Sequence, residues 1–382
     1  MNVLSIIMLV FAVIGAFDRI IGNKFGLGEQ FEKGFMLLGN MALTMIGVIV
    51  LAPAIATYAA PVFNAIYAAI GLDPSVLAAS ILANDSGGTP LALAIMKDPA
   101  MGGYNALVIS SMMGCTISYT SPYALGVVNK EHYSDMFLGI LCGIVTIPIG
   151  SYISGLVLGL HPLLLLYNLA PLFVLSIIIA IGLFFAQKIT IKIFYIIGII
   201  MKIIITVGLV IGMIEIVLGI SIIPKSADMM ASMGIPTGME LIEYGGIICL
   251  NGSIVLCGAF PLMTIVSRLL KRPLGFFGRK LGVNEQSTVG LITTIVSSTP
   301  TFEMVNRMDR RGIIINSAFA ISAAFTFGGH LAFTMAIDPE YVFPMIIAKL
   351  ISGVFAFLLA LPIATRAVKG SQKDNSITNI AE

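Results

Sequence analysis

Long apolar runs separated by short polar stretches recur from one end of the chain to the other. About 20 apolar residues in a helix are enough to cross the hydrocarbon of a bilayer. We therefore expect an all-α polytopic membrane protein with about nine transmembrane helices. The expected spans lie near residues 3–17, 34–59, 104–128, 136–160, 163–186, 193–222, 241–267, 312–336 and 341–365.

Two further apolar segments, 74–97 and 285–308, are interrupted by polar residues. The first contains ILANDSGGTP at 81–90, and the second contains SSTP at 297–300. The pairs Thr89-Pro90 and Thr299-Pro300 suit an N-cap followed by proline at the first helical position, so each segment is expected to form two half-helices. Bare backbone at membrane depth is tolerated only where protein or water satisfies it, which predicts a polar cavity near the midplane.

The second half of the chain resembles the first at an offset of 211 residues. At this offset Glu29 matches Glu240, Asn40 matches Asn251 and Gly71 matches Gly282, and with one residue of slack SGGTP falls on SSTP. This favours one membrane transport domain over 1–366, with repeat one at about 1–160, a linking span at 163–186 and repeat two at about 193–366. Residues 367–382 are expected to form a short polar cytoplasmic tail.

The distribution of lysine and arginine predicts the orientation of the spans. If both broken segments enter and leave on one side, the external loops hold only Lys97 and Lys225, and the other loop and tail cations face the cytoplasm. If both segments crossed fully, the charges would divide more evenly. We therefore expect two re-entrant segments, inverted repeats, an outside N-terminus and a cytoplasmic C-terminus in the cell membrane.

Composition agrees with this class and excludes others. The 382 residues are 58% hydrophobic and 10% charged, whereas soluble domains carry roughly a quarter of their residues as charges. The net charge of +2 gives no reason to expect nucleic acid as a partner. The four cysteines lie in apolar segments without metal-ligand spacing, so we expect packing thiols, no metal and no cofactor. No Lys or Arg precedes the apolar start, so the first segment is expected to stay as a span rather than be cleaved.

The first break supplies the main candidate substrate-binding residues. Asp85 is an intramembrane carboxylate, which is a functional candidate by default, and it would offset the partial positive charge of the half-helix N-terminus behind it. The alternative is a capping residue. Glycine there suits a tight turn or close approach of a ligand to backbone. The candidates from this break are Asn84, Asp85, Ser86, Gly87, Gly88 and Thr89.

The second break lacks a carboxylate at the matching place and offers Ser297, Ser298 and Thr299 as hydroxyl donors or as caps. Other candidates each have two interpretations. Tyr119 and Tyr123 can hold an ammonium by cation–π attraction or pack in the core, and Asn40 and Asn251 can line the cavity or bond between helices. Glu303 can act in the site or pair with an arginine, and His330 can relay protons. Lys202, Glu215 and Lys349 are expected to snorkel to an interface or pair within the bundle.

Several of these segments resemble the bacterial ethanolamine-utilisation permease family. They are GEQFEKGFMLLGNMALTMIGVIVLAP, ILANDSGGTPLALA, ISSMMGCTISYTSPYALG, GIVTIPIGSYISG and SSTPTFEMVNRMD. Members of that family read Cys-Asp-Met before the Gly-Gly where this chain has Asn84-Asp85-Ser86, so the aspartate is kept. The resemblance implies uptake of ethanolamine across the cytoplasmic membrane, to feed a cobalamin-dependent ammonia-lyase pathway.

These observations lead to the hypothesis of an alternating-access transporter in which Asp85 binds the ammonium of ethanolamine and a hydroxyl of the second break holds the alcohol. An ion-coupled carrier for another small cation or amino acid, and a passive ethanolamine channel, remain alternatives. The coupling ion, proton or sodium if there is one, and the oligomeric state stay open. An intramembrane enzyme is disfavoured, because aspartyl catalysis needs two close carboxylates and no other catalytic set is evident.

Overall fold

The computed structural model describes residues 3–232 and 234–378, and every regular element in these ranges is helical. This confirms the all-α prediction. In chain order the elements are α1 (Val3–Ile20), α2 (Gly28–Ile70), α3 (Ser75–Ile81), η1 (Asn84–Ser86), α4 (Gly88–Ile95), α5 (Pro99–Tyr104), η2 (Asn105–Gly114), η3 (Thr116–Thr120), α6 (Ser121–Val127), η4 (Lys130–His132), α7 (Tyr133–Val157), α8 (Pro162–Asn168), α9 (Ala170–Phe185), α10 (Gln187–Leu218), α11 (Ala227–Ser232), α12 (Leu241–Leu281), α13 (Glu285–Val296), α14 (Ser298–Met304), η5 (Val305–Arg307), α15 (Arg310–Ala323), α16 (Gly329–Ile337), η6 (Pro339–Tyr341) and α17 (Val342–Thr378).

Six helices in the described ranges are long and apolar enough to cross a membrane, or seven if the pair α8–α9, bent by 41°, is one span. The chain is thus a multi-pass membrane protein. Three of the nine expected spans are divided. Residues 163–186 bend between α8 and α9, residues 312–336 are interrupted between α15 and α16, and residues 104–128 change winding along their length. The elements η2 and η3 are π-helical, and helical winding continues from α5 to α6, which has Pro122 in its first turn.

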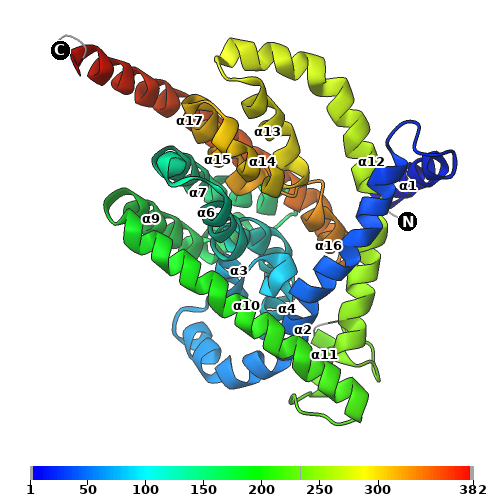
Figure 1. Cartoon of the computed structure of the whole chain (residues 1–382). Helices are drawn as coiled ribbons and strands as arrows, with labels where there is room; N and C mark the ends of the chain where they lie inside the picture. Colours follow the sequence, from blue (N-terminus) through cyan, green and yellow to red (C-terminus); the bar gives the residue numbers. More distant parts are fainter. Residues whose placement is uncertain (1–2, 233, 379–382) are drawn as a thin grey trace.

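Two long helices, α2 and α12, lie side by side and run in opposite directions (Figure 1). Glycines bring other helices close to them. A Cβ on Gly47 of α2 would lie 1.8 Å from Ile205 O of α10, and a Cβ on Gly258 of α12 would lie 1.9 Å from Met8 O of α1. Only glycine permits these approaches.

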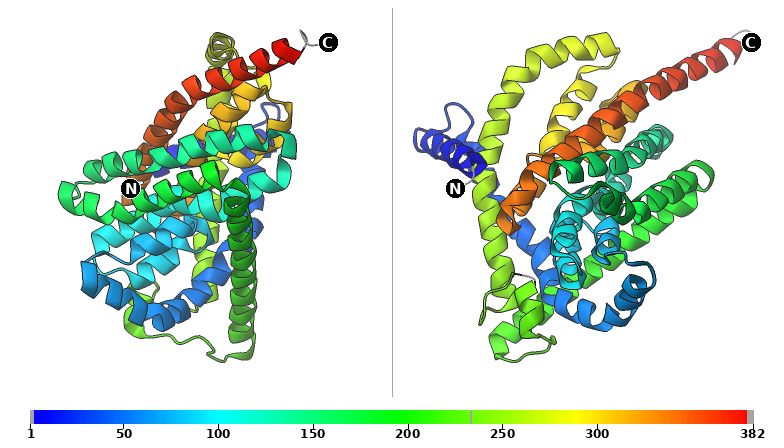
Figure 2. Two further views of the ribbon diagram at one scale, coloured as in Figure 1. Left: turned by 90° about the vertical axis from the view of Figure 1, so that its left-hand side faces the viewer. Right: turned by 180° about the vertical axis from the view of Figure 1, so that it is seen from behind.

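A second group of helices, α7, α15 and α17, packs together beside the first (Figure 2). At one end Arg310 Nε donates to both carboxylate oxygens of Asp135, each at 2.9 Å, which joins the starts of α15 and α7. The C-terminal end of α17 extends beyond the other helices in both views of Figure 2. It reaches Thr378, so part of the expected polar tail is helical, and residues 379–382 lie outside the described ranges.

Both interrupted segments divide into two short helices as predicted, α3 and α4 in the first and α13 and α14 in the second. The prediction of Thr89 and Thr299 as N-caps is wrong, whereas Ser297 is a cap, one of its two expected roles. Gly87 is the N-cap of α4, and the Thr89 hydroxyl instead donates to Ala106 O of η2 at 2.6 Å. Ser297 is the N-cap of α14, where its hydroxyl accepts from Thr299 N at 3.3 Å. In both cases the helix begins before the Thr-Pro pair.

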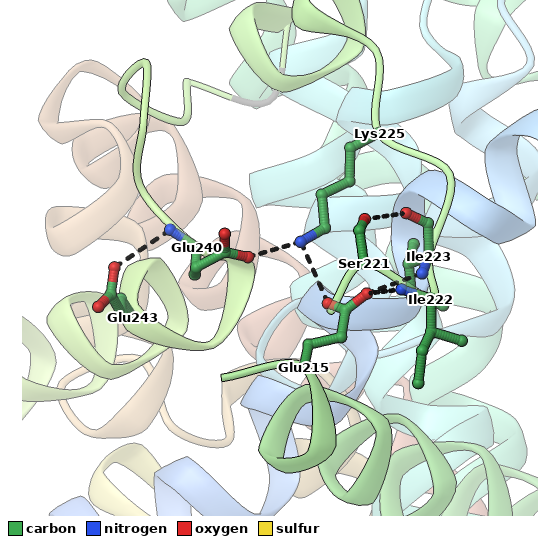
Figure 3. Close-up of polar contacts among 7 residues, drawn as sticks. All are labelled: Glu215, Ser221, Ile222, Ile223, Lys225, Glu240 and Glu243. Atoms are coloured by element: carbon green, nitrogen blue, oxygen red, sulfur yellow. Dashed lines mark hydrogen bonds and ion pairs between the residues drawn. The ribbon is translucent and has the colours of Figure 1, made fainter. Parts of the chain in front are cut away.

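The loop between α10 and α12 is held by a polar group, here called the Lys225 cluster, of Glu215, Lys225, Glu240 and Glu243 (Figure 3). Lys225 Nζ lies 3.1 Å from Glu215 Oε2 and 2.5 Å from Glu240 Oε2. Glu215 also accepts from the backbone N–H groups of Ile222 and Ile223 at 2.6 and 2.7 Å. Partial burial opposes the charge of Lys225, but its bonds to Glu240 and Glu215 outweigh this and raise its pKa. Glu215 is therefore paired within the bundle, one of its two expected states.

Candidate functional site

The first break is a tight turn that leaves no room for side chains at its two glycines. Gly87 has a φ of +105°, and a Cβ there would lie 2.3 Å from Val48 Cγ1 of α2. A Cβ on Gly88 would lie 2.2 Å from Leu82 O. Ser118 of η3 accepts from Ala83 N at 2.9 Å and so satisfies a backbone donor at the end of α3. The glycines therefore serve turn geometry and close packing.

Asn84 and Asp85 occupy the middle of this turn. Asn84 is 0% exposed, and among the described residues neither its amide oxygen nor its amide nitrogen has a hydrogen-bond partner. Buried polar side-chain atoms are bonded in the large majority of cases, so this unpartnered amide is a candidate ligand-binding group. Asp85 is half-buried and accepts from Ser86 Oγ at 3.2 Å. Its Oδ2 lies 3.9 Å from the position of a Cβ on Gly329, at the start of α16.

The second break contributes hydroxyls and no carboxylate. Ser298 is 0% exposed, and its hydroxyl has no partner within the described part of the chain. Thr299 Oγ1 lies 3.3 Å from the hydroxyl of Tyr119 on η3. The hydroxyl of Ser297 is used as the helix cap. Ser298 is thus the free hydroxyl of the predicted trio, and Thr299 ties the break to the π-helical segment.

A third interruption, between α15 and α16, lies against the second break. Phe325 N donates to Thr294 O at 3.2 Å, and Phe327 N donates to Ile295 O at 2.9 Å. Gly328 is close-packed as well, since a Cβ there would lie 1.9 Å from Val296 O. The peptide groups released from the α15–α16 helix are therefore partly satisfied by the end of α13.

Aromatic rings connect the two breaks. Tyr119 stacks on Tyr123 at 5.9 Å between centroids and meets Phe325 edge-on at 5.8 Å. Phe325 in turn lies 5.0 Å from the ring of His330, the residue that follows Gly329. This series runs from Thr299 in the second break to the helix start beside Asp85. The predicted residues Tyr119, Tyr123 and His330 thus belong to one cluster with both breaks.

Glu303 joins this cluster through Tyr123, whereas Asn40 and Asn251 lie elsewhere. The Glu303 carboxylate accepts from the Tyr123 hydroxyl at 2.8 Å and has no ion pair with an arginine among the described residues. Asn40 is exposed on α2. Asn251 is also exposed and lines an apolar cavity of about 340 Å³ with Ser5 and with the end of α16 remote from His330. The two asparagines are not brought together at the breaks.

Lys349 of α17 contacts His330 of this cluster, where the sequence had left open whether it snorkels to an interface or pairs within the bundle. Its side chain is 1% exposed, so it does not snorkel. Nζ donates to Ser111 O of η2 at 2.6 Å and lies 3.1 Å from His330 Nδ1. A lysine in the middle of the apolar run of α17 was the available signal. The arrangement places one buried amine and one carboxylate around the start of α16.

Comparison with known proteins gives one consistent family. The profile of the family described as "Ethanolamine utilisation protein, EutH" matches residues 1–363. A protein of Listeria monocytogenes named "Probable ethanolamine permease EutH" is 42% identical over 368 residues, which cover 96% of this chain and 95% of that protein. The protein of the same name from Salmonella typhimurium is 36% identical, with 96% of each chain covered. An "Uncharacterized protein YxeR" of Bacillus subtilis is 38% identical over 92% of this chain and 91% of its own length. No solved structure matches.

Proposed function

The chain belongs to the EutH family of ethanolamine utilisation proteins, and from that premise we propose that it is a carrier that imports protonated ethanolamine across the cytoplasmic membrane. Relatives named as probable ethanolamine permeases support a transporter rather than an enzyme. The charged ammonium faces a penalty of several kcal/mol in hydrocarbon. A protein route is therefore most useful in acidic media, where the amine is protonated.

The observation that carries the proposal is the pairing of a free amide with a carboxylate in the first break. Ethanolamine has an ammonium and a hydroxyl separated by two carbons, so its site needs an anion and a neutral polar group close together. Asp85 supplies the anion, and the unpaired amide of Asn84 supplies both a donor and an acceptor for the hydroxyl. Ser298 offers a second free hydroxyl from the other break, and Tyr119 and Tyr123 flank the cation.

The proposal includes nine crossings, two re-entrant segments and inverted repeats, with repeat one at about 1–160, repeat two at about 193–366 and the span 163–186 between them. Helix ends support the repeat. At the offset of 211 residues, the end of α2 at Ile70 corresponds to the end of α12 at Leu281. The glycines that follow, Gly71 and Gly282, both have positive φ, of 64° and 66°.

Contacts support the repeat as well. Asp98 and Asp309 are 211 residues apart, and each accepts from the backbone N–H three residues later, that of Met101 or Gly312. Each aspartate also closes the base of its broken segment. The N–H of Asp98 bonds to Asp73, and Asp309 accepts from the N–H of Asn284, the residue at the position of Asp73. These paired clamps agree with two copies of one structural unit.

Alternating access would then rock one repeat against the other around the two breaks. In the proposed orientation the N-terminus is outside and the C-terminus cytoplasmic, as the loop charges favour. Reporter enzymes fused to the C-terminus test this directly, since activity of a reporter that works only outside the cell would contradict it.

The test of function is uptake of radiolabelled ethanolamine into proteoliposomes at acidic pH. Asp85→Asn removes one partner of a charge-assisted hydrogen bond, worth about 1.5–3 kcal/mol, so the apparent affinity should fall about 10- to 100-fold. Asp228→Asn makes the same change at an exposed aspartate of α11 and serves as the matched control. Equal uptake by Asp85→Asn and wild type would refute the assignment of the ammonium site.

Counterflow separates a carrier from a pore. Proteoliposomes loaded with unlabelled ethanolamine should transiently accumulate labelled ethanolamine above its external concentration if the protein is a carrier. A passive channel would not show this overshoot. Competition by choline, alanine and serine measures whether another small cation or amino acid is preferred.

A further inference from the structure

Lys349 is a buried amine, and no carboxylate among the described residues contacts it. In the described part of the chain its Nζ has two polar neighbours, Ser111 O at 2.6 Å and His330 Nδ1 at 3.1 Å. Desolvating an ammonium is expensive unless it is paired, and a purely structural position could be filled by methionine or leucine. Unlike arginine, a buried lysine can exist in both protonation states. The position therefore has the properties of a functional group.

The titratable groups near Lys349 come from several elements. His330 belongs to α16, Cys115 lies between η2 and η3, and Asp85 lies in η1 of the first break. Lys349 Nζ lies 3.1 Å from His330 Nδ1, and Asp85 Oδ2 lies 3.9 Å from the position of a Cβ on Gly329, the residue before His330. Of these titratable groups, Asp85 is the one that carries a negative charge at neutral pH in its ordinary state. Lys349 and Asp85 thus form a separated pair with no direct contact.

The contact with His330 can survive the loss of a proton. As an ammonium, Lys349 donates to Nδ1 of a neutral imidazole. As a neutral amine, it accepts from Nδ1–H of the other His330 tautomer, while one of its two N–H groups still donates to Ser111 O. Both protonation states are therefore hydrogen-bonded, so the lysine can lose and regain a proton without leaving a buried polar atom unpaired.

Neither Asp85 nor Lys349 has a charged residue at the matching position of the other repeat. At the offset of 211 residues, Asp85 corresponds to Val296 and Lys349 to Leu138, so each charged group has an apolar counterpart. One negative and one positive charge balance in the empty site. Adding an ethanolammonium ion beside Asp85 would leave one excess positive charge in a region of low dielectric. A proton leaving Lys349 removes that excess.

We propose that Lys349 couples transport to protons, so that binding of one ethanolammonium ion at Asp85 releases one proton from Lys349, which regains a proton after the substrate leaves on the cytoplasmic side. The proton enters from the cytoplasm and departs to the outside. One ethanolammonium ion moves in for each proton moved out, which is the net import of one neutral ethanolamine and no charge. This rests on the function proposed above and specifies its coupling.

Membrane potential distinguishes this exchange from uniport of a cation. A potassium gradient with valinomycin sets an inside-negative potential of about 60 mV, which for a singly charged permeant ion corresponds to about tenfold accumulation. Wild-type proteoliposomes should reach the same internal ethanolamine concentration with and without this potential. Lys349→Met should accumulate ethanolamine about tenfold in response to it. Lys202→Met, at an exposed lysine of α10, is the matched control and should behave as wild type.

A second measurement does not depend on Lys349→Met folding. Adding ethanolamine hydrochloride to purified wild-type protein in weakly buffered solution with a pH dye should release about one proton per ethanolamine bound. Lys349→Arg, which stays charged, should release none. Potential-driven accumulation by wild type, absence of proton release from wild type, or full release from Lys349→Arg would each overturn the coupling role. Absence of ethanolamine uptake by wild type at zero potential would instead contradict the proposed function itself.

Discussion

Replacing Asn84 by leucine tests whether its amide is reserved for a ligand. Leucine is close to asparagine in size and shape but has no polar atoms, so the substitution removes a buried amide whose two atoms have no partner among the described residues. An unsatisfied buried polar group costs about 1–3 kcal/mol. Asn84→Leu should therefore stabilise the substrate-free protein, by about 1–3 kcal/mol if one of the two atoms accounts for most of the cost.

The same change should damage recognition of the hydroxyl. A site built to bond a substrate hydroxyl rejects the analogue that lacks it, because its polar groups are then left unpaired. Wild type should prefer ethanolamine to ethylamine, and Asn84→Leu should lose most of that preference. Asn84→Leu should thus raise the stability of the substrate-free protein and lower its selectivity for ethanolamine over ethylamine. A general packing defect would not produce this combination.

Both effects can be measured on one preparation. The free, buried cysteines Cys115, Cys142, Cys249 and Cys257 react with a thiol-sensitive dye on unfolding, so dye fluorescence reports Tm without ligand. A gain of this size should raise Tm by a few °C. Selectivity is the ratio of ethylamine to ethanolamine concentrations that halve uptake of labelled ethanolamine. Asn64→Leu, at an exposed asparagine of α2, is the matched control. A lower Tm with unchanged selectivity in Asn84→Leu would show that Asn84 is a structural residue and would refute the reasoning.

Three other substitutions test contacts at the site and in the Lys225 cluster. Gly88→Ala places a Cβ 2.2 Å from a backbone oxygen and should lower the free energy of unfolding by about 1–3 kcal/mol. Gly39→Ala, where a Cβ would meet open space, is the control and should not lower it. Equal Tm values for the two variants would contradict the close packing at Gly88. Tyr123→Phe removes the bond to Glu303 but keeps the ring, so uptake should stay near wild type if the ring faces the cation, and a loss above about tenfold would assign the role to the hydroxyl. Lys225→Met removes the bridge of the Lys225 cluster and should lower Tm at pH 7. Because the folded pKa is raised above 10.5, the wild-type advantage should be complete below about pH 10 and shrink as pH rises further; an advantage that persists through strongly alkaline pH would argue against the ion pair.

The breaks could be predicted because their signal is local. Polar and glycine residues in an apolar run mark the turn around Asp85 whatever the rest of the chain does. The same signal was present at Gly328-Gly329, between α15 and α16, within the segment that the sequence interpretation counted as the single span 312–336. There no charged residue accompanies the glycines, so hydropathy alone favoured a continuous helix.

The caps and the burial of Lys349 depend on tertiary contacts. The Thr89 hydroxyl, a reasonable N-cap by sequence, bonds to Ala106 O of a neighbouring helix. A single lysine in an apolar helix gives the same sequence pattern whether its side chain points to an interface or into the protein. The choice depends on which face of α17 meets η2, where Ser111 O accepts from it. The π-helical winding from Asn105 to Thr120 likewise had no counterpart in the hydrophobic pattern.

Under the proposed repeat, positions that match between the halves and positions that differ should have separate roles. Asp98 and Asp309 accept equivalent backbone hydrogen bonds. Substituting either aspartate should therefore lower the free energy of unfolding by a similar amount. Asp85 and Lys349 face Val296 and Leu138 at the matching positions, so neither charge is required to build the unit. A fold assembled twice gives two similar breaks, but a substrate with one charge needs one anion. In this proposal the unmatched carboxylate sets which break receives the ammonium, and the unmatched amine, placed on the other half, balances that carboxylate when the substrate is absent.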